Sequence, residues 1–379
     1  MIGLMTPYKV SNYGTKLQAY AVQQVVSRYG ETEIIDYEPA LYDRMVHRFE
    51  YVRSKRYRDF APASEIAGAV DSTLVEARNG AIAAFDAELR VSPHLSGSLS
   101  LRRHARVYDA VVCGSDQIWN PINLAWHAYM LEFVPQKTLK VAFSPSFGVS
   151  QVPNELRATY RRRLARMNYL SVRESSGLGI LEKLGFGGAT WTLDPTLVLG
   201  AHDWEGLAER PFSFNEPEEG YLFCYFLGTR RLGRDVAREI ARRRGLTVVS
   251  LPHFKGYVPA DEDFGDVCLY DVTVRGFVWL LMHATAVCTD SFHGSAFSLL
   301  FERELYCCPR HEDCDAAGTN DRLFSLLTSV GMGERLIRDL DDLAAPIDDV
   351  FDYEEASYFL AERRKETLAY LDGALGGLR

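Results

Sequence analysis

The chain has 379 residues, of which 47% are hydrophobic and 25% are charged, and its formal net charge is −9. This composition is typical of a globular protein, and the length predicts two domains rather than a single core. Because no domain-wide surplus of basic residues exists, the charge argues against a protein that binds nucleic acid.

The start of the chain, MIGLMTPYK, does not follow the order of basic and apolar residues found in secretory signal peptides. No apolar run reaches the roughly 18 residues that a membrane-spanning helix needs. Seven cysteines without regular spacing do not predict a disulfide framework. The cluster of Cys307, Cys308, His311 and Cys314 has metal-binding residue types, but its spacing fits zinc poorly. We therefore expect a cytoplasmic protein without a bound metal.

Residues 1–190 are expected to form a doubly wound α/β domain, because short apolar runs alternate there with small polar loops and helical patterns. The expected strands are Ile2–Met5, 33–37, 108–113, 141–143 and 169–172. Asn12 and Gly14 precede a helix over 17–29, where they either line a binding cleft or form an ordinary turn. Residues 39–95 interrupt the pattern with a largely helical excursion, which we interpret as a flexible flap over the cleft.

The third strand ends in Gly114, Ser115 and Asp116, and Trp119 follows shortly after. A glycine directly after a strand lets the backbone approach a ligand closely. We therefore expect Ser115 and Asp116 to line a site and Trp119 to offer a stacking face. An ordinary turn with Trp119 in the core is the alternative. Arg173, after the fifth strand, is placed either to bind an anion or to form a structural salt bridge.

Residues 191–345 repeat the alternation of strands and helices, and we expect them to form a second α/β domain. The expected strands are 221–227, 246–251, 267–270, Ala286–Thr289 and 305–308. Gly228, Thr229 and Arg231 stand where the first of these strands leads into a helix, a pattern that predicts a phosphate site at the helix N-terminus. Arg322 falls in the first turn of a later helix, where its charge opposes the helix dipole unless it meets an anion.

The strongest functional pattern is the turn formed by Asp290, Ser291, Phe292, His293 and Gly294. It joins the apolar strand Ala286–Thr289 to an apolar helix expected over 295–301. Ligands of open α/β sheets bind outside the carboxyl ends of the strands. An imidazole followed by glycine and by free N–H groups of a helix suits an anionic substrate. A histidine satisfied within an ordinary turn is the alternative.

Seven motifs follow one another between Ile2 and Arg335: NYGTKLQAYAVQ, VVCGSDQIWNP, SFG, SVRESSG, LDPTLVL, TDSFHGSAFSLLF and NDRLFSLL. This ordered set resembles the polysaccharide pyruvyl transferases. The resemblance implies an α/β fold with two Rossmann-like domains, 1–190 and 191–345, facing across a cleft as in the GT-B glycosyltransferases. A C-terminal helix within 346–379 is expected to pack back on the first domain. Members of the family move the pyruvyl group of phosphoenolpyruvate onto sugar hydroxyls, commonly as a ketal, and release phosphate.

In this family the turn is often Arg-Leu-His, and its arginine and histidine help to bind and activate phosphoenolpyruvate. His293 and Phe292 match the last two positions, but Ser291 stands in place of the arginine. Serine cannot supply a fixed cation for phosphate or carboxylate, so another residue must. The candidates for this cation are Arg173, Arg231 and Arg322.

By the resemblance, His293 is expected to act as the general acid or base. Asp290 either orients its imidazole or caps the following helix, and the cap is favoured. Asp116 is the second candidate, for deprotonating the acceptor. The other residues expected to contact substrate are Asn12, Gly14, Gly114, Ser115, Trp119, Arg173, Gly228, Thr229, Arg231, Ser291, Phe292, Gly294 and Arg322.

The implied partners are phosphoenolpyruvate and a glycan or lipid-linked sugar, and this acceptor could bring the protein to the inner surface of the membrane. No cofactor is expected, and the oligomeric state stays open. Two other hypotheses remain. One is a GT-B-like glycosyltransferase that uses a nucleotide sugar on the same two-domain architecture. The other is a non-catalytic relative in the glycan pathway, suggested by Ser291.

Overall fold

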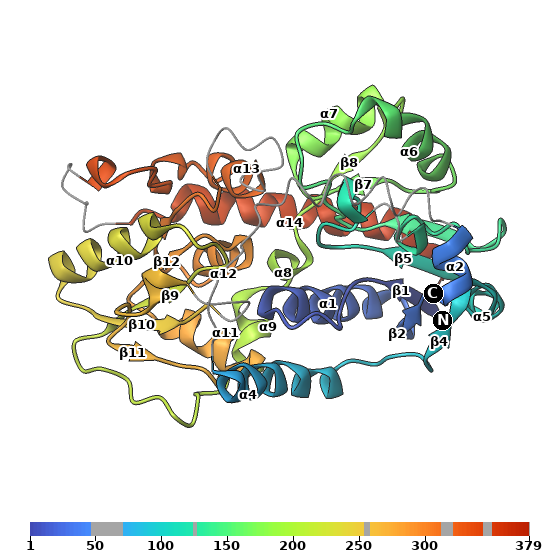
Figure 1. Ribbon diagram of the computed structural model, residues 1–379. Coiled ribbons are helices and arrows are strands. Elements are labelled where there is room, and N and C mark those ends of the chain that lie inside the picture. The colour runs from blue at the N-terminus through green and yellow to red at the C-terminus, as the bar shows by residue number, and fades with distance from the viewer. Residues whose placement is uncertain (47–70, 124–126, 254–257, 312–320, 344–350, 379) are drawn as a thin grey trace.

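The protein consists of two α/β halves, each built on its own parallel sheet, as the computed structural model in Figure 1 shows. The structure describes residues 1–46, 71–123, 127–253, 258–311, 321–343 and 351–378. Within these residues every pair of named strands is parallel. Parallel neighbours need crossover connections, which the helices between the strands supply.

The N-terminal half contains a four-stranded sheet in the order β2-β1-β5-β6 and two short strand pairs, β3-β4 and β7-β8. The strands are β1 (Ile2–Met5), β2 (Thr32–Ile34), β3 (Tyr37–Glu38), β4 (Leu95–Ser96), β5 (Ala110–Cys113), β6 (Leu139–Ala142), β7 (Ser171–Val172) and β8 (Thr190–Trp191). The helices are α1 (Tyr13–Val26), α2 (Leu41–Val46), α4 (Ser72–Ala83), α5 (Gly97–His104), α6 (Arg157–Leu164) and α7 (Ser175–Lys183). All residues of β1 and β5 are buried, because a parallel sheet is covered on both faces.

The C-terminal half contains a five-stranded sheet in the order β11-β10-β9-β12-β13. Its strands are β9 (Tyr221–Tyr225), β10 (Thr247–Leu251), β11 (Val267–Cys268), β12 (Ala286–Thr289) and β13 (Glu304–Cys307). The helices from the junction onward are α8 (Pro195–Val198), α9 (Ala201–Glu205), α10 (Arg231–Arg244), α11 (Val274–His283), α12 (Phe292–Leu300), α13 (Asp321–Ser329) and α14 (Glu354–Leu375). β1 and β12 have the predicted bounds, and the other expected strands overlap their predicted ranges.

The first turn of α1 anchors one half of the molecule in the other. The ring of Tyr13 stacks on that of Phe277 in α11, with a centroid separation of 4.5 Å and an interplanar angle of 4°. Its hydroxyl donates a hydrogen bond of 2.8 Å to the carbonyl of Val272. Buried residues of both halves belong to one hydrophobic cluster, so the start of α1 is fixed relative to the C-terminal sheet.

The excursion after β3 does not behave as a flap where the structure describes it. Arg78 of α4 is 1% exposed, and its guanidinium donates to the carbonyls of Leu269 at 2.8 Å and Tyr270 at 3.2 Å in the C-terminal half. The prediction of a flexible flap is therefore wrong for α4, and its remaining part, residues 47–70, lies outside the described residues.

Helix α14 runs along both halves of the molecule, as Figure 1 shows. On the N-terminal half, the hydroxyl of Tyr370 donates to the carbonyl of Ala142 at 2.8 Å, and the hydroxyl oxygen of Thr367 accepts from the amide of Leu193 at 2.9 Å. None of the described helices is both long enough and apolar enough to cross a membrane.

Candidate active site

His293 projects from the first turn of α12, directly after β12, and is 7% exposed. The helix begins at Phe292 rather than at residue 295 as predicted, because Ser291 is its N-cap: the Ser291 hydroxyl accepts from the amide of Gly294 at 3.3 Å. Gly294 lies against Thr289, whose Oγ1 would be 2.8 Å from an added Cβ. Ser291 and Gly294 therefore shape the start of the helix that carries the imidazole.

Gly14 in the first turn of α1 faces the imidazole across the junction between the two halves. A Cβ added to Gly14 would lie 2.2 Å from Nδ1 of His293, far inside van der Waals contact. Asn12 accepts from the amide of Thr15 at 3.1 Å and so caps α1 at the point of this approach. We expected Asn12 and Gly14 to line a cleft or to form a turn. In the structure they place the N-terminus of α1 against the imidazole of His293.

A buried ion pair lies beside His293. Nη1 of Arg173, after β7, donates to Oδ2 of Asp194 at 2.6 Å, and the two residues are 5% and 1% exposed. Nε2 of His293 lies 3.9 Å from Oδ1 of the same carboxylate. Asp194 also caps α8, because its Oδ1 accepts from the amide of Thr196 at 3.0 Å. In the sequence, Asp194 appears only within the motif LDPTLVL and was not predicted as a site residue.

Several polar atoms of this cluster are buried and have no hydrogen-bond partner. They are Nε and Nη2 of Arg173 and Nε2 of His293. Most buried polar atoms in proteins are paired, and each unpaired one carries a desolvation cost. Donors and an imidazole nitrogen left open side by side are typical of a site that a polar ligand completes.

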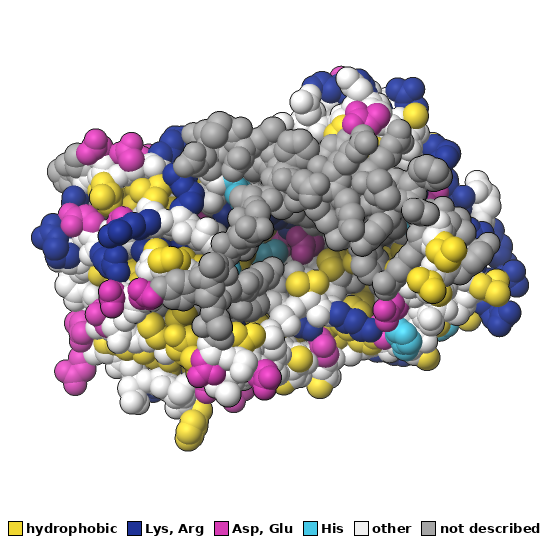
Figure 2. Space-filling model, in the orientation of Figure 1, with side chains coloured by type: hydrophobic (Ala, Val, Ile, Leu, Met, Phe, Trp, Pro, Cys, Tyr) yellow, Lys and Arg dark blue, Asp and Glu magenta, His cyan; other side chains and the backbone are white. Residues whose placement is uncertain are grey.

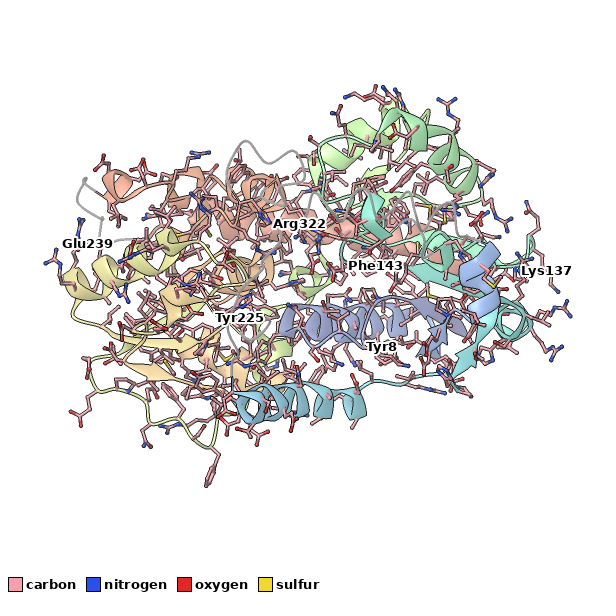
Figure 3. All side chains as sticks on the ribbon, viewed as in Figure 1. Tyr8, Lys137, Phe143, Tyr225, Glu239 and Arg322 are labelled. Atoms are coloured by element: carbon pink, nitrogen blue, oxygen red, sulfur yellow. The ribbon has the colours of Figure 1, made fainter. Side chains whose placement is uncertain are left out.

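A second cation approaches from α13. The guanidinium carbons of Arg173 and Arg322 lie 4.4 Å and 5.8 Å from the centroid of the Phe292 ring, and Arg322 is 8% exposed. Burial and the nearby charge of Arg173 lower the pKa of Arg322 to about 9. When the amide of Gln117 presents its oxygen, it accepts from Nε of Arg322 at 2.9 Å. Figure 3 places Arg322 near the middle of the molecule.

The titratable groups of the cluster have shifted pKa values. Burial lowers the pKa of His293 to about 4, although the charge of Asp194 acts in the opposite direction, so the imidazole is neutral at pH 7. Burial alone would raise the pKa of Asp194, but the charge of Arg173 lowers it to about 2. Burial alone would lower the pKa of Arg173, but Asp194 and other carboxylates raise it above the usual value. The ground state therefore pairs a neutral imidazole with ionised partners.

Asp116 lies at the edge of the same cluster. Burial works against its ionisation, but the charges of Arg173, His293 and Arg322 lower its pKa below the usual range. Its Oδ2 accepts from the hydroxyl of Thr15 at 3.2 Å. Its φ of 62° is in the left-handed region, which is uncommon for a residue other than glycine.

Two cavities border the cluster. One of about 560 Å³ reaches it at Asp116 and Gln117, and one of about 30 Å³ is lined by Arg173, Asp194 and Arg322 among others. Figure 2 shows histidine and acidic side chains in a recess near the middle of the displayed face. Among the described residues, no group of three or more metal-ligating side chains could hold a metal ion, and Cys314 of the suspected cluster lies outside them.

The sequence profile of a family described as polysaccharide pyruvyl transferase matches residues 12–312. The chain belongs to the polysaccharide pyruvyl transferase family. The matched segment begins at the cap of α1 and includes Arg173, Asp194 and His293, and the family makes the protein a transferase of polysaccharide modification. Arg322 lies beyond the match.

The solved structures that resemble this chain include sugar-nucleotide epimerases and glycosyltransferases. A UDP-N-acetylglucosamine 2-epimerase has 11% identity and a TM-score of 0.52, with 100% of this chain and 96% of that one covered. The glycosyltransferase SnogD from Streptomyces nogalater has 14% identity, a TM-score of 0.46, and coverage of 99% and 98%. The UDP-GlcNAc 2-epimerase from Methanocaldococcus jannaschii has 11% identity, a TM-score of 0.45, and coverage of 97% and 92%. No curated protein matches the chain.

These comparisons confirm the expected fold class, two Rossmann-like domains arranged as in the GT-B proteins. They carry no information on substrate, because identities of this size show the fold alone. The family membership and the geometry around His293 therefore have to carry the functional argument.

The structure contradicts both roles expected for Asp290. Its two carboxylate oxygens accept from the amides of Leu227 and Gly228, each at 2.7 Å. The carboxylate thus ties the loop after β9 to the loop after β12, and it neither caps α12 nor bonds to the imidazole of His293. Arg310 adds a hydrogen bond of 3.0 Å to the carbonyl of Asp290.

The contacts after β9 argue against the predicted phosphate site. Asp290 already occupies the amide of Gly228, and the side chain of Arg231 is 77% exposed and paired with Asp235 at 3.2 Å. Thr229 and Arg231 line a separate surface cavity of about 360 Å³, which has none of the residues around His293 in its lining. A cation at this helix start faces solvent, so it concentrates no field on a ligand.

Asp116 of the loop after β5 lines the larger cavity, but Gly114, Ser115 and Trp119 of the same loop support the site rather than lining it. Gly114 has a φ of 141°, and an added Cβ would lie 1.8 Å from the carbonyl oxygen of Phe143, so the close approach is to the neighbouring strand and not to a ligand. Ser115 is fully buried, and its hydroxyl donates to Oδ2 of Asp194 at 3.1 Å. Trp119 is also fully buried, which makes its predicted stacking role wrong.

Proposed function

We propose that this protein transfers the pyruvyl group of phosphoenolpyruvate to hydroxyls of a sugar and releases phosphate. The observation that carries the proposal is the convergence of Arg173, Arg322 and His293 on Phe292, with open donors on Arg173 and an open nitrogen on His293. Phosphoenolpyruvate has a carboxylate and a phosphate, and two buried guanidinium groups match these two anions with charge-assisted hydrogen bonds.

Arg322 supports this assignment despite the serine at position 291. Ser291 is 3% exposed, and its hydroxyl caps α12. The positive charge that the family often has at this position must therefore come from another residue. Arg322 brings a guanidinium to the ring of Phe292 from another element, α13. We infer that Arg322 replaces the arginine that the family often has before the apolar residue and the histidine. This inference argues against a non-catalytic relative.

In the proposed reaction, His293 donates a proton to the donor and Asp116 accepts one from the acceptor. Binding of the anionic donor beside His293 raises the pKa of the imidazole, which then gives a proton to the methylene carbon of phosphoenolpyruvate. A sugar hydroxyl attacks the adjacent carbon, and Asp116 accepts the hydroxyl proton. The C–O bond to phosphate breaks, and its electron pair leaves with the phosphate. A second hydroxyl then attacks the same carbon and gives its proton to the departing phosphate. The proton held by Asp116 returns to His293 through solvent, which restores both side chains. The product is a cyclic ketal and one phosphate.

The cavity beside Arg173 and Arg322, to which we assign the donor, has a volume of only about 30 Å³. That space suits about one water molecule. The proposal therefore expects the side chains of Arg322 and Phe292 to move when the donor binds. The acceptor is expected to be a glycan or a lipid-linked sugar, met in the cytoplasm or at the inner surface of the membrane.

Two measurements test the proposed function. Titration calorimetry of the full chain should give saturable binding of phosphoenolpyruvate, and incubation with phosphoenolpyruvate and candidate glycans should release phosphate. Turnover of a nucleotide sugar without binding of phosphoenolpyruvate would instead support the glycosyltransferase alternative. Absence of binding and of any turnover would support a non-catalytic relative.

A further inference from the structure

The larger cavity, of about 560 Å³, opens at the carboxyl ends of three neighbouring strands of the N-terminal sheet. Its lining comes from the segments after β1, β2 and β5. The residues used below are Tyr8, Lys9, Asp36, Tyr37, Asp116 and Tyr129. The volume is within the range of roughly 300–1,000 Å³ found for small-molecule sites. Figure 3 labels Tyr8 in the N-terminal half, beside α1.

The charges of this cavity are already paired. Nζ of Lys9 lies 2.5 Å from Oδ1 of Asp36, and Nδ1 of His94 lies 3.1 Å from Oδ2 of the same carboxylate. The other carboxylate in the lining, Asp116, accepts from Thr15. Because each cation among the described lining residues has a carboxylate partner, the cavity has no positive charge left for an anionic ligand.

The rest of the lining is amphipathic. Tyr8, Tyr37 and Tyr129 contribute aromatic rings, and ring faces pack well against the C–H surface of a sugar while hydroxyls bond to its oxygens. The hydroxyl of Tyr37 is buried and has no hydrogen-bond partner. Such an atom needs a partner, and a ligand hydroxyl in the cavity would provide one.

Asp116 places this cavity next to the donor-binding cluster. Asp116 belongs to the lining, and the positive charges of Arg173 and Arg322 lower the pKa of its carboxyl group. A ligand hydroxyl that reaches Asp116 from the cavity therefore approaches the side chains assigned to phosphoenolpyruvate.

We propose that the cavity bounded by Tyr8, Tyr37, Tyr129 and Asp116 is the acceptor site and that it binds an uncharged sugar. This proposal rests on the proposed function for its role, since it makes Asp116 the boundary between acceptor and donor. The binding of a neutral sugar is nevertheless a separate property of the N-terminal half. Acidic sugars are disfavoured, because Lys9 is committed to Asp36.

Saturation-transfer difference NMR on the full chain tests the proposal. The probes are p-nitrophenyl glycosides of galactose, glucose, mannose and their N-acetylamino forms, with p-nitrophenyl glucuronide as the acidic comparison. At least one neutral glycoside should bind, and the glucuronide should bind more weakly. Tyr37→Phe should weaken the neutral probe about tenfold, because one hydrogen bond is lost. Tyr37→Ala should weaken it further, because the ring face is lost as well.

The matched control is Tyr358→Phe, since Tyr358 is 70% exposed on α14 and lies outside the cavity lining. This variant should bind the probe as the wild type does, and melting curves should confirm that all variants fold. The proposal would be overturned if no neutral glycoside binds or if the glucuronide binds more tightly than the neutral probes. It would also be overturned if both folded Tyr37 variants bind the neutral probe as tightly as the wild type does. Binding of a neutral glycoside without binding of phosphoenolpyruvate would instead leave the sugar site in place and refute the proposed reaction.

Discussion

The loops that follow β9 and β12 belong to neighbouring strands of one sheet, but they differ in what they contact. Both lead into a helix, and each has polar or cationic residues at the turn. The first turn of α12, which follows β12, meets α1 of the N-terminal half and Asp194 at the junction, and its histidine is buried. The loop after β9 ends in Arg231, which faces solvent.

This difference shows what makes a strand–loop–helix segment into a site. Charged side chains interact strongly only where water is excluded, and exposed ones are screened within about 10 Å at ordinary ionic strength. The opposite half of the molecule excludes water at His293. Near Arg231, the part of the chain that the structure describes leaves the side chain 77% exposed. The predictions below separate the two regions.

Replacing the histidine should have the largest effect. His293→Gln should lower the rate of phosphate release by about 10²–10⁴-fold, because the general acid is lost. Steady-state assays of phosphoenolpyruvate turnover measure this. His283→Gln is the matched control, since His283 is exposed at the end of α11 and should change the rate little. A variant at position 293 with wild-type turnover would remove the catalytic assignment.

The second largest effect concerns Arg173 and Arg231, which should differ in their importance for binding phosphoenolpyruvate. Arg173→Lys keeps the charge beside Asp194 but loses the planar fork, and loss of a charge-assisted hydrogen bond should weaken donor binding by about 10–100-fold. Arg231→Lys, in the loop after β9, should bind phosphoenolpyruvate as the wild type does. Titration calorimetry of both variants measures the difference. Equal losses at the two positions would mean that the loop after β9 also holds the donor.

Two glycine variants test the contact between α1 and the imidazole. Gly14→Ala forces a Cβ against Nδ1 of His293 and should cost about 1–3 kcal/mol of unfolding free energy. Gly80→Ala, within α4, meets no atom within 4 Å and should gain roughly 0.4–1 kcal/mol. Urea denaturation measures both values. If Gly14→Ala is as stable and as active as the wild type, α1 does not fix the imidazole.

The smallest effect concerns pH. The pKa of His293 is lowered from 6.5 to about 4 in the folded state, so the unfolded chain binds a proton more readily. The contribution of the neutral imidazole to the free energy of unfolding is complete above pH 6.5 and is lost as the pH falls toward 4. At pH 5.5 the loss should be about 1 kcal/mol, seen as the difference in pH dependence between wild type and His293→Gln. Parallel stability curves would contradict the assigned pKa.

The same histidine should respond to the donor. NMR titration of its ring protons should give a pKa near 4 in the free protein, and the bound dianionic phosphate should raise it. An unchanged pKa in a complex with phosphoenolpyruvate would place the anion away from the imidazole.

Much of the fold could be predicted from the sequence. Apolar runs bounded by glycine and polar residues predicted β1 and β12 to the residue, and the order of motifs predicted the family. Helix starts were predicted less well, because Asn12 and Ser291 cap their helices three or more residues before the apolar pattern begins. A capping side chain acts locally, so this error could have been avoided from sequence alone.

The sequence by itself determined the strands, the two-domain α/β class, the family and the prominence of His293, because these depend on short-range patterns and on motif order. Only the tertiary structure decided that Asp194 adjoins the imidazole, that Asp290 ties two loops together, and that Arg231 stays outside. The physical reason is that the character of a side chain in a site depends on its burial and on its charged neighbours. Those neighbours come from segments distant in the chain, and no local pattern records them.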